Sequence, residues 1–266
     1  MAVIFVSGYS KRSLVSRTGF TTQHTLSMSG GNAQSNYRVS VDYRNAHGID
    51  LRSKREEYGA RASMMHTTKG GLFTLTANVA PRIIYRDQAD WSVFKDAIEA
   101  NPTTPLMDPE NPARYYNFQG QVVGSNPVER QKLEKDHGDT KLLDWDGTVK
   151  LNLLPLLLKD GKGNHNLSTQ VMFADHQYDN NTSWFRPSTS TICINNGHDG
   201  EASRSYSKER QYVLEWLTNY TGTFGKHNVK GMAGYSYQYS QYEGLNNGNK
   251  DFPNDGLTYN NMGTGE

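Results

Sequence analysis

YRVSVDYR, residues 37–44, alternates strictly between two kinds of side chain. The apolar or aromatic positions are Tyr37, Val39, Val41 and Tyr43, and the polar positions between them are Arg38, Ser40, Asp42 and Arg44. Successive side chains of a β-strand point to opposite faces of its sheet. The stretch therefore predicts a strand with one apolar face and one strongly polar face.

The same alternation recurs along the chain. We expect about eight such segments, each near or above the roughly 9–11 residues that a tilted strand needs to cross a bilayer. It is clearest at residues 25–29, 37–44, 73–79, 145–153, 167–173 and 229–238. Soluble antiparallel sheets alternate in the same way, so this periodicity by itself does not place the strands in lipid.

The connections between the segments sort by length. Short turns are expected at residues 30–35, 68–71, 159–164 and 225–226, and longer segments at 46–55, 85–140, 180–207 and from 243 onward. Short and long connections thus alternate, which is typical of a barrel with turns on one side of a membrane and loops on the other. The sequence predicts an all-β, antiparallel, up-and-down transmembrane β-barrel segment with long extracellular loops.

Aromatic residues gather near the expected strand ends. They include Trp184 and Phe185, Trp216 and Tyr220, and Tyr235, Tyr237, Tyr239 and Tyr242. Rings at these places form interfacial girdles in membrane barrels. Ordinary cross-strand aromatic packing is the alternative interpretation.

Composition excludes several other classes. Only 35% of residues are hydrophobic, and the mean hydropathy is −0.76, so a thick aliphatic core is not expected. Because 28 basic and 27 acidic side chains are mixed along the chain, no basic face indicates nucleic acid. No apolar run approaches the roughly 18 residues of a membrane helix. The opening Met1–Ser7 lacks the basic leader and cleavage site of a signal peptide.

Catalytic and metal chemistry find little support. The visible carboxylate pairs, Glu56–Glu57 and Asp144 with Asp146, are expected at a loop junction and on the polar face of a strand, where they are solvated. The eight histidines show no ligand spacing, and the single cysteine, Cys193, excludes an internal disulfide and a multi-cysteine metal site. We therefore expect neither an enzyme nor a bound cofactor or metal.

Several short motifs occur in a fixed order. The sequence SGGN at residues 29–32 is followed by Tyr37, Ser40, Tyr43 and Gly48, and QHTLSM precedes it at residues 23–28. Further along come NPTTP at 101–105, YYNFQG at 115–120 and NP at 126–127. In this order the motifs resemble landmarks of SusC/RagA-type TonB-linked outer-membrane proteins, over roughly residues 17–266.

The resemblance implies a role in transport. A complete relative would be a plugged barrel of about 22 strands in the bacterial outer membrane. It would import oligosaccharides or peptides with energy from the TonB system and work with a SusD-like surface lipoprotein. Residues 1–266 are then expected to form a partial barrel domain, without the plug, the TonB box and the final barrel strands.

Two alternatives remain at this point. A small closed barrel with a structural or adhesive role would require the strand near residues 23–29 to pair with the strand near residues 227–239. The repeated cations Arg38, Arg44, Arg61, Lys150 and Lys230 instead suit a wide hydrated lumen. A soluble binding sandwich is the second alternative.

Ligand-binding residues are expected among the loop aromatics, because flat rings bury the apolar faces of sugars. The candidates are Trp91, Tyr115, Tyr116, Trp184 and Phe185. The competing interpretation is that these rings pack the loops together. Helical spacing of Trp91, Phe94 and Ile98 predicts a short helix within residues 89–99.

Overall fold

The structure is a computed structural model that describes residues 14–15, 18–154 and 164–266. Its main feature is one antiparallel sheet in which eight strands follow each other in chain order. The strands are β1 (Phe20–Gly31), β2 (Ser35–His47), β3 (Lys54–Thr67), β4 (Phe73–Asp87), β5 (Lys135–Asn152), β6 (His165–Arg186), β7 (Glu201–Phe224) and β8 (His227–Lys250). The predicted all-β, up-and-down arrangement is confirmed.

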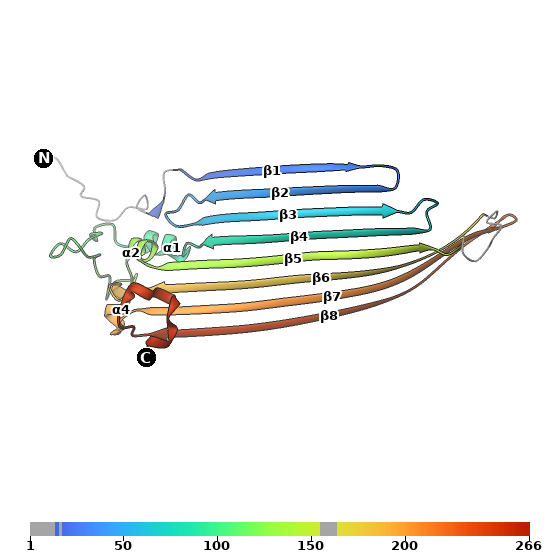
Figure 1. Ribbon diagram of the computed structural model, residues 1–266. Coiled ribbons are helices and arrows are strands. Elements are labelled where there is room, and N and C mark those ends of the chain that lie inside the picture. Colours follow the sequence, from blue (N-terminus) through green and yellow to red (C-terminus); the bar gives the residue numbers. More distant parts are fainter. Residues whose placement is uncertain (1–13, 16–17, 155–163) are drawn as a thin grey trace.

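Five short helices within the described residues lie at one end of the sheet (Figure 1). They are α1 (Ser92–Glu99), α2 (Pro127–Leu133), α4 (Thr191–Asn196), η2 (Asp255–Asn260) and η3 (Met262–Thr264). The helix predicted within residues 89–99 is thus confirmed as α1. None of the helices in the described part of the chain is both long and apolar enough to cross a bilayer.

The sheet is open. Strands β1 and β8 lie at its opposite edges (Figure 1). Each strand from β1 to β7 is hydrogen-bonded to the strand that follows it in the sequence. A closed eight-stranded barrel would need β1 to pair with β8. The structure does not have the small closed barrel considered as an alternative.

Strand register keeps the two kinds of side chain apart. Leu26 is opposite Val41, which is opposite Ala60, and Val79 is opposite Trp145. On the other side, Thr25 is opposite Asp42, and Asn78 is opposite Asp146. We call the side that carries Val41 and Trp145 the apolar face, and the side that carries Asp42 and Asp146 the polar face.

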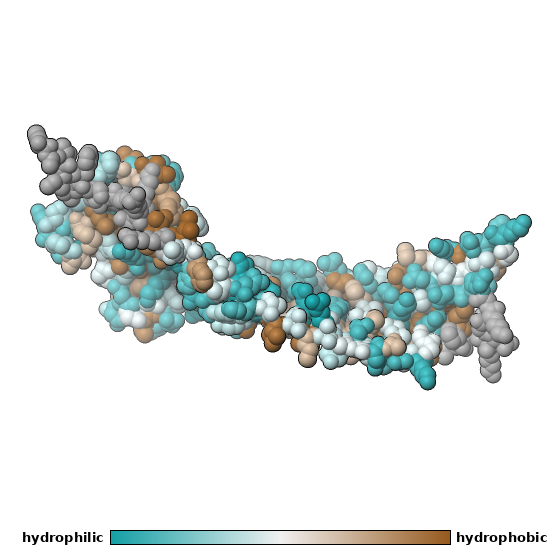
Figure 2. All heavy atoms as spheres, turned by 90° about the horizontal axis from the view of Figure 1, so that it is seen from above, coloured by the Kyte–Doolittle hydropathy of each residue, from teal (hydrophilic) through white to brown (hydrophobic). Residues whose placement is uncertain are grey.

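The apolar face is largely uncovered. Val39, Val41 and Tyr237 retain 39%, 49% and 49% of their accessible surface. The described hydrophobic clusters instead lie at the loop end, one around Val93, Phe118 and Val128 and one around Phe185 and Phe252. Figure 2 accordingly shows a thin, bent plate that is thicker at that end.

Among the described residues, short and long connections lie at opposite ends of the sheet, as predicted. The turns 32–34, 68–72 and 225–226 lie at one end of the sheet, and the segments 48–53, 88–134, 187–200 and 251–266 lie at the other (Figure 1). The turn expected at residues 159–164 falls almost entirely outside the described residues.

The strands are longer than the sequence predicts. β6 continues to Arg186, β7 begins at Glu201, and β8 extends to Lys250, all within segments expected to be loops. Alternation disappears there because both faces become polar. Cross-strand hydrogen bonds nevertheless continue, so the backbone stays in the sheet.

Candidate functional site

An ion-pair network lies on the polar face of β2, β3 and β4. The side chain of Glu57 is only 4% exposed, and its carboxylate lies 2.5 Å from Arg55 Nε and 3.0 Å from Arg82 Nη1. Arg44 lies 3.8 Å from the same carboxylate, and Arg82 also pairs with Asp42 at 3.4 Å. The carboxylate thus holds three half-exposed guanidinium groups in place.

Two glycines make room for charged side chains on the polar face. A Cβ atom on Gly59 would lie 2.5 Å from Asp42 Oδ1, and one on Gly138 would lie 2.6 Å from Arg86 Nε. Arg86 passes over Gly138 and donates a hydrogen bond to Asn180 Oδ1 at 3.1 Å. The polar contacts therefore extend from β2 to β6.

Charge divides unevenly over the polar face. Register places six arginines and two carboxylates on its β1–β4 half: Arg38, Arg44, Arg55, Arg61, Arg82 and Arg86 with Asp42 and Glu57. Six carboxylates and four cations lie on the β5–β8 half: Asp136, Asp144, Asp146, Glu201, Glu209 and Glu215 with Lys150, Arg186, Lys230 and Lys250. The face is highly charged, and its β1–β4 half is cationic.

Two aromatic rows cross the apolar face. One consists of His24, Tyr43, Tyr58 and Tyr85, with ring centroids 5.1–6.4 Å apart. The other consists of Trp145, Phe173, Tyr212 and Tyr239, with centroids 5.3–6.2 Å apart. Toward the loops from these rows, the same face carries polar residues, such as Glu56 and Arg210. The rows mark the loop-side border of the exposed apolar band.

The longest loop folds over a hydrophobic cluster. Val93 and Ala97 of α1, Phe118, and Val128 of α2 are buried together. Asn126 caps α2 by accepting hydrogen bonds from Val128 N and Glu129 N, and its Nδ2 donates to Leu106 O at 3.0 Å. The Asn126–Pro127 motif therefore starts a helix and fixes the loop.

A buried carboxylate joins this loop to the next one. Glu129 is 1% exposed and accepts hydrogen bonds from the backbone N of Thr191, at 2.7 Å, and from its hydroxyl. Burial raises the pKa of Glu129, and the hydrogen bonds from Thr191 oppose that shift. Close by, Arg186 pairs with Glu134 at 2.8 Å and with Glu201 at 2.9 Å. The long loops form one cap.

The five predicted aromatic residues do not form a single site. Trp91 is 62% exposed and stacks on Phe94 at a centroid distance of 5.5 Å. Tyr115 and Tyr116 pack against the hydrophobic cluster of the loop. Trp184 lies on the polar face, where the Arg186 guanidinium is 4.7 Å from its ring centroid. In this arrangement only Trp91 offers a largely free ring.

Phe185 lies in the second hydrophobic cluster. Its side chain is 2% exposed and packs with Ala202 and Phe252 on the face opposite Trp184. Adjacent strand residues point in opposite directions, and the segment after β8 covers Phe185. In this conformation its ring is not accessible to a ligand.

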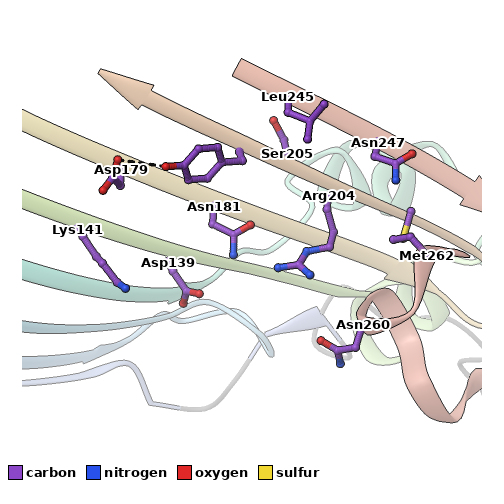
Figure 3. Close-up of a pocket in the computed structure, with 11 residues that line it drawn as sticks. Asp139, Lys141, Asp179, Asn181, Arg204, Ser205, Leu245, Asn247, Asn260 and Met262 are labelled. Carbon is purple, nitrogen blue, oxygen red and sulfur yellow. Dashed lines mark hydrogen bonds between the residues drawn. The ribbon is translucent and has the colours of Figure 1, made fainter. Parts of the chain in front are cut away.

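A further cavity was not predicted. It has a volume of about 630 Å³ and lies between β5–β8 and the final turns (Figure 3). Strand register places it on the apolar-face side of these strands, beyond the aromatic row. Its lining comes from all four strands and from the turns after β8: Asp139, Lys141, Asp179, Asn181, Arg204, Ser205, Tyr206, Leu245, Asn247, Asn260 and Met262. No local motif unites these residues, because only the register of four strands brings them together.

Metal-binding and thiol chemistry are limited in the described residues. They contain no group of three or more His, Cys, Asp or Glu side chains that could hold a metal ion. Cys193 is buried in α4, and burial raises its pKa to about 12. Its thiol is therefore a poor nucleophile near neutral pH.

Comparison with known proteins gives a consistent result. No family model matches the chain. Over 92% of its length it is 24% identical to TonB-dependent receptor P3 of Formosa agariphila, of which it covers 24%. The RagAB peptide importer in its open-open state superposes with a TM-score of 0.71 at 16% identity, over 92% of this chain and 27% of that one.

A second structure of the RagAB peptide transporter gives a TM-score of 0.70 over 96% of this chain and 28% of that one. The chain thus spans about a quarter of the length of the relatives it matches. The barrel-type fold is shown by these superpositions, and the resemblance predicted from the sequence is confirmed. The eight strands superpose on part of the RagAB structures, and the chain is similar in sequence to a TonB-dependent receptor.

Proposed function

We propose that residues 1–266 form part of the barrel wall of an outer-membrane active transporter, with the rest of the barrel and the TonB-contacting region supplied by a longer receptor. One observation carries the proposal. A single sheet has an exposed apolar face bordered by aromatic rows, a charged face behind it, and its long loops at one end. The apolar face contacts lipid, and the polar face lines the lumen.

The different surroundings that apolar and charged side chains require support this orientation. Burying apolar surface is worth about 25 cal/mol per Å², and soluble proteins rarely expose apolar patches larger than a few hundred Å². Ionisable residues at membrane depth face protein or water-filled space. The arginine network around Glu57 meets that requirement if the polar face looks into a hydrated lumen.

The proposed cargo is an oligosaccharide or a peptide. The RagAB structures are of a peptide importer, and the exposed Trp91 ring suits stacking on a sugar. The joined loops form a surface on which a SusD-like lipoprotein would act as a lid. Trp91 and Trp184 are the loop-end rings that we propose contact cargo or lid, whereas Tyr115 and Tyr116 hold the loop. No catalytic step is proposed.

The test compares two adjacent residues of β6 in the complete receptor. Val171 lies on the apolar face and Gln170 on the polar face. A cation on the lipid side near mid-bilayer costs about 2–4 kcal/mol. We expect Val171→Arg to lower the amount of heat-resistant receptor in outer-membrane fractions at least several-fold, and Gln170→Arg to leave it near the wild-type level.

Uptake then tests the transport role. In cells that depend on this receptor, deletion of its gene should abolish uptake of a labelled oligosaccharide or peptide pool, and Gln170→Arg should retain uptake. Equal tolerance of both arginine substitutions would contradict the orientation. Unchanged uptake of every labelled pool after deletion would contradict transport.

A further inference from the structure

The cavity between β5 and β8 faces away from the proposed lumen. Asp139, Asp179 and Arg204 belong to the same face as Trp145, Phe173 and Leu214, as strand register requires. The cavity therefore lies on the outer surface of the wall, above the apolar band. A molecule bound there is not cargo in transit through the lumen.

Height above the band limits what can reach the cavity. Tyr206 and Arg204 are six and eight residues beyond Tyr212 of the aromatic row on β7. At about 3.3 Å per residue this is roughly 20–26 Å along the strand, or roughly 14–19 Å along the membrane normal for a tilt near 45°. A phospholipid headgroup layer is only about 5–8 Å thick on each side. The cavity lies beyond that layer.

The lining carries balanced charge and both kinds of hydrogen-bonding group. Asp139 and Asp179 supply acceptors, Lys141 and Arg204 supply donors, and Asn181 and Asn247 supply both. Among the described residues, neither Lys141 nor Arg204 has a carboxylate within ion-pair distance. Figure 3 shows Arg204 and Asn181 directed into the space between the strands and the final turns.

Tyr206 adds a flat surface. The residue is 40% exposed, and its hydroxyl donates to Asp179 Oδ1 at 3.4 Å. Sugar hydroxyls need donors and acceptors together, and pyranose faces stack on aromatic rings. Two carboxylates in the lining disfavour a simple phosphate or sulfate. The volume of about 630 Å³ is within the usual range for small-ligand sites.

We propose that this cavity is an outward-facing site for an uncharged glycan, separate from the transport path. The placement rests on the proposed function, because the apolar face must contact lipid for the cavity to look outward. The glycan reaches the site either from a membrane glycolipid or as a free oligosaccharide. Both sources present the same hydroxyl-rich chemistry.

The experiment uses the complete receptor purified in detergent and two neighbouring asparagines of β8. Asn247 lines the cavity, whereas Asn246 lies on the polar face, and both side chains are exposed. The probes are digalactosyl diacylglycerol, the free hexasaccharide maltohexaose, and phosphatidylglycerol as an anionic lipid without sugar. Native mass spectrometry gives the dissociation constant for each probe.

We expect wild-type receptor and Asn246→Ala to bind at least one sugar probe more tightly than phosphatidylglycerol. Combining Asp179→Asn with Asn247→Ala should weaken sugar binding about tenfold or more, through lost hydrogen bonds. If the receptor binds the galactolipid more tightly, the natural glycan belongs to a membrane lipid. If it binds maltohexaose more tightly, the natural glycan is a free oligosaccharide. Both of these results support the site.

Equal sugar affinity in wild type and the double variant would overturn the proposal, as would tighter binding of phosphatidylglycerol than of both sugars. Heat resistance in gels checks that each variant is folded. Failure of this proposal can be distinguished from failure of the proposed function. If the receptor reaches the outer membrane and imports cargo but binds neither sugar at this cavity, only the glycan site is contradicted.

Discussion

Glu129 shows how one residue can set a pH dependence in the loop cap. It is almost fully buried and bonds Thr191 of the neighbouring loop. Burial raises its pKa above the ordinary value of 4.5. A raised carboxyl pKa adds stability that is complete below the unfolded value and is lost as pH rises through the folded value. The contact between α2 and α4 should therefore be stronger in mild acid than at neutral pH.

Hydrogen–deuterium exchange of the Thr191 and Ile192 amides tests this expectation. After correction for intrinsic exchange, protection should fall as pH rises from about 4.5 toward neutrality, and Glu129→Gln should remove that dependence because the amide does not titrate. Lys95→Gln is a suitable control, since among the described residues Lys95 pairs only with Glu99, on the exposed side of α1. A pH dependence that is identical in Glu129→Gln and wild type would assign the effect to another group.

At the scale of elements, the ion pair between Asp42 and Arg82 on the polar face of β2–β4 depends on Gly59 of β3. A Cβ atom on Gly59 would lie 2.5 Å from Asp42 Oδ1, so Asp42 would have to move and its 3.4 Å ion pair with Arg82 would be disturbed. In the described part of the chain, a Cβ atom on Gly147 of β5 would have no neighbour within 4 Å. Both glycines lie in the middle of strands, Gly59 on the polar face and Gly147 on the apolar face.

We expect Gly59→Ala to lower the unfolding temperature of the complete receptor by a few degrees, and Gly147→Ala to leave it unchanged or raise it slightly. Displacing a packed, charge-assisted contact costs roughly 1–3 kcal/mol, while alanine in place of glycine reduces the entropy of the unfolded chain. Thermal unfolding followed by circular dichroism measures both. Equal shifts in the two variants would show that the Asp42–Arg82 pair adds nothing to stability.

For the whole molecule, the sorting of connections predicts sidedness. Lys69 lies in the turn between β3 and β4, and Glu110 lies in the long loop between β4 and β5, at opposite ends of the sheet (Figure 1). In intact cells a membrane-impermeant maleimide should label Glu110→Cys and leave Lys69→Cys unlabelled. Both should react after the outer membrane is permeabilised.

Cys193 provides an internal check in the same experiment. Because burial raises its pKa to about 12, it should stay unlabelled near neutral pH until the protein is denatured. Labelling of Lys69→Cys in intact cells would show that the turn between β3 and β4 faces the outside, which contradicts the proposed orientation. Labelling of native Cys193 would show that the cap opens.

The sequence by itself determined the two-faced strands, their antiparallel order and the sorting of connections. Each of these depends on local patterns: alternation such as Tyr37 to Arg44, and turn residues between such runs. The strand extensions to Arg186 and Lys250 escaped prediction because both faces are polar there. Their hydrogen bonds connect residues distant in sequence, which no local pattern reports.

Only the tertiary structure decided how the loop-end residues are used. Trp184 and Phe185 look equivalent in sequence, yet one lies on the polar face beside Arg186 and the other is buried under the segment after β8. The cavity that contains Asp139, Asp179 and Arg204 arises where separate strands meet. A pattern along one strand fixes which face a side chain occupies, but register between strands and loop packing decide what that side chain meets.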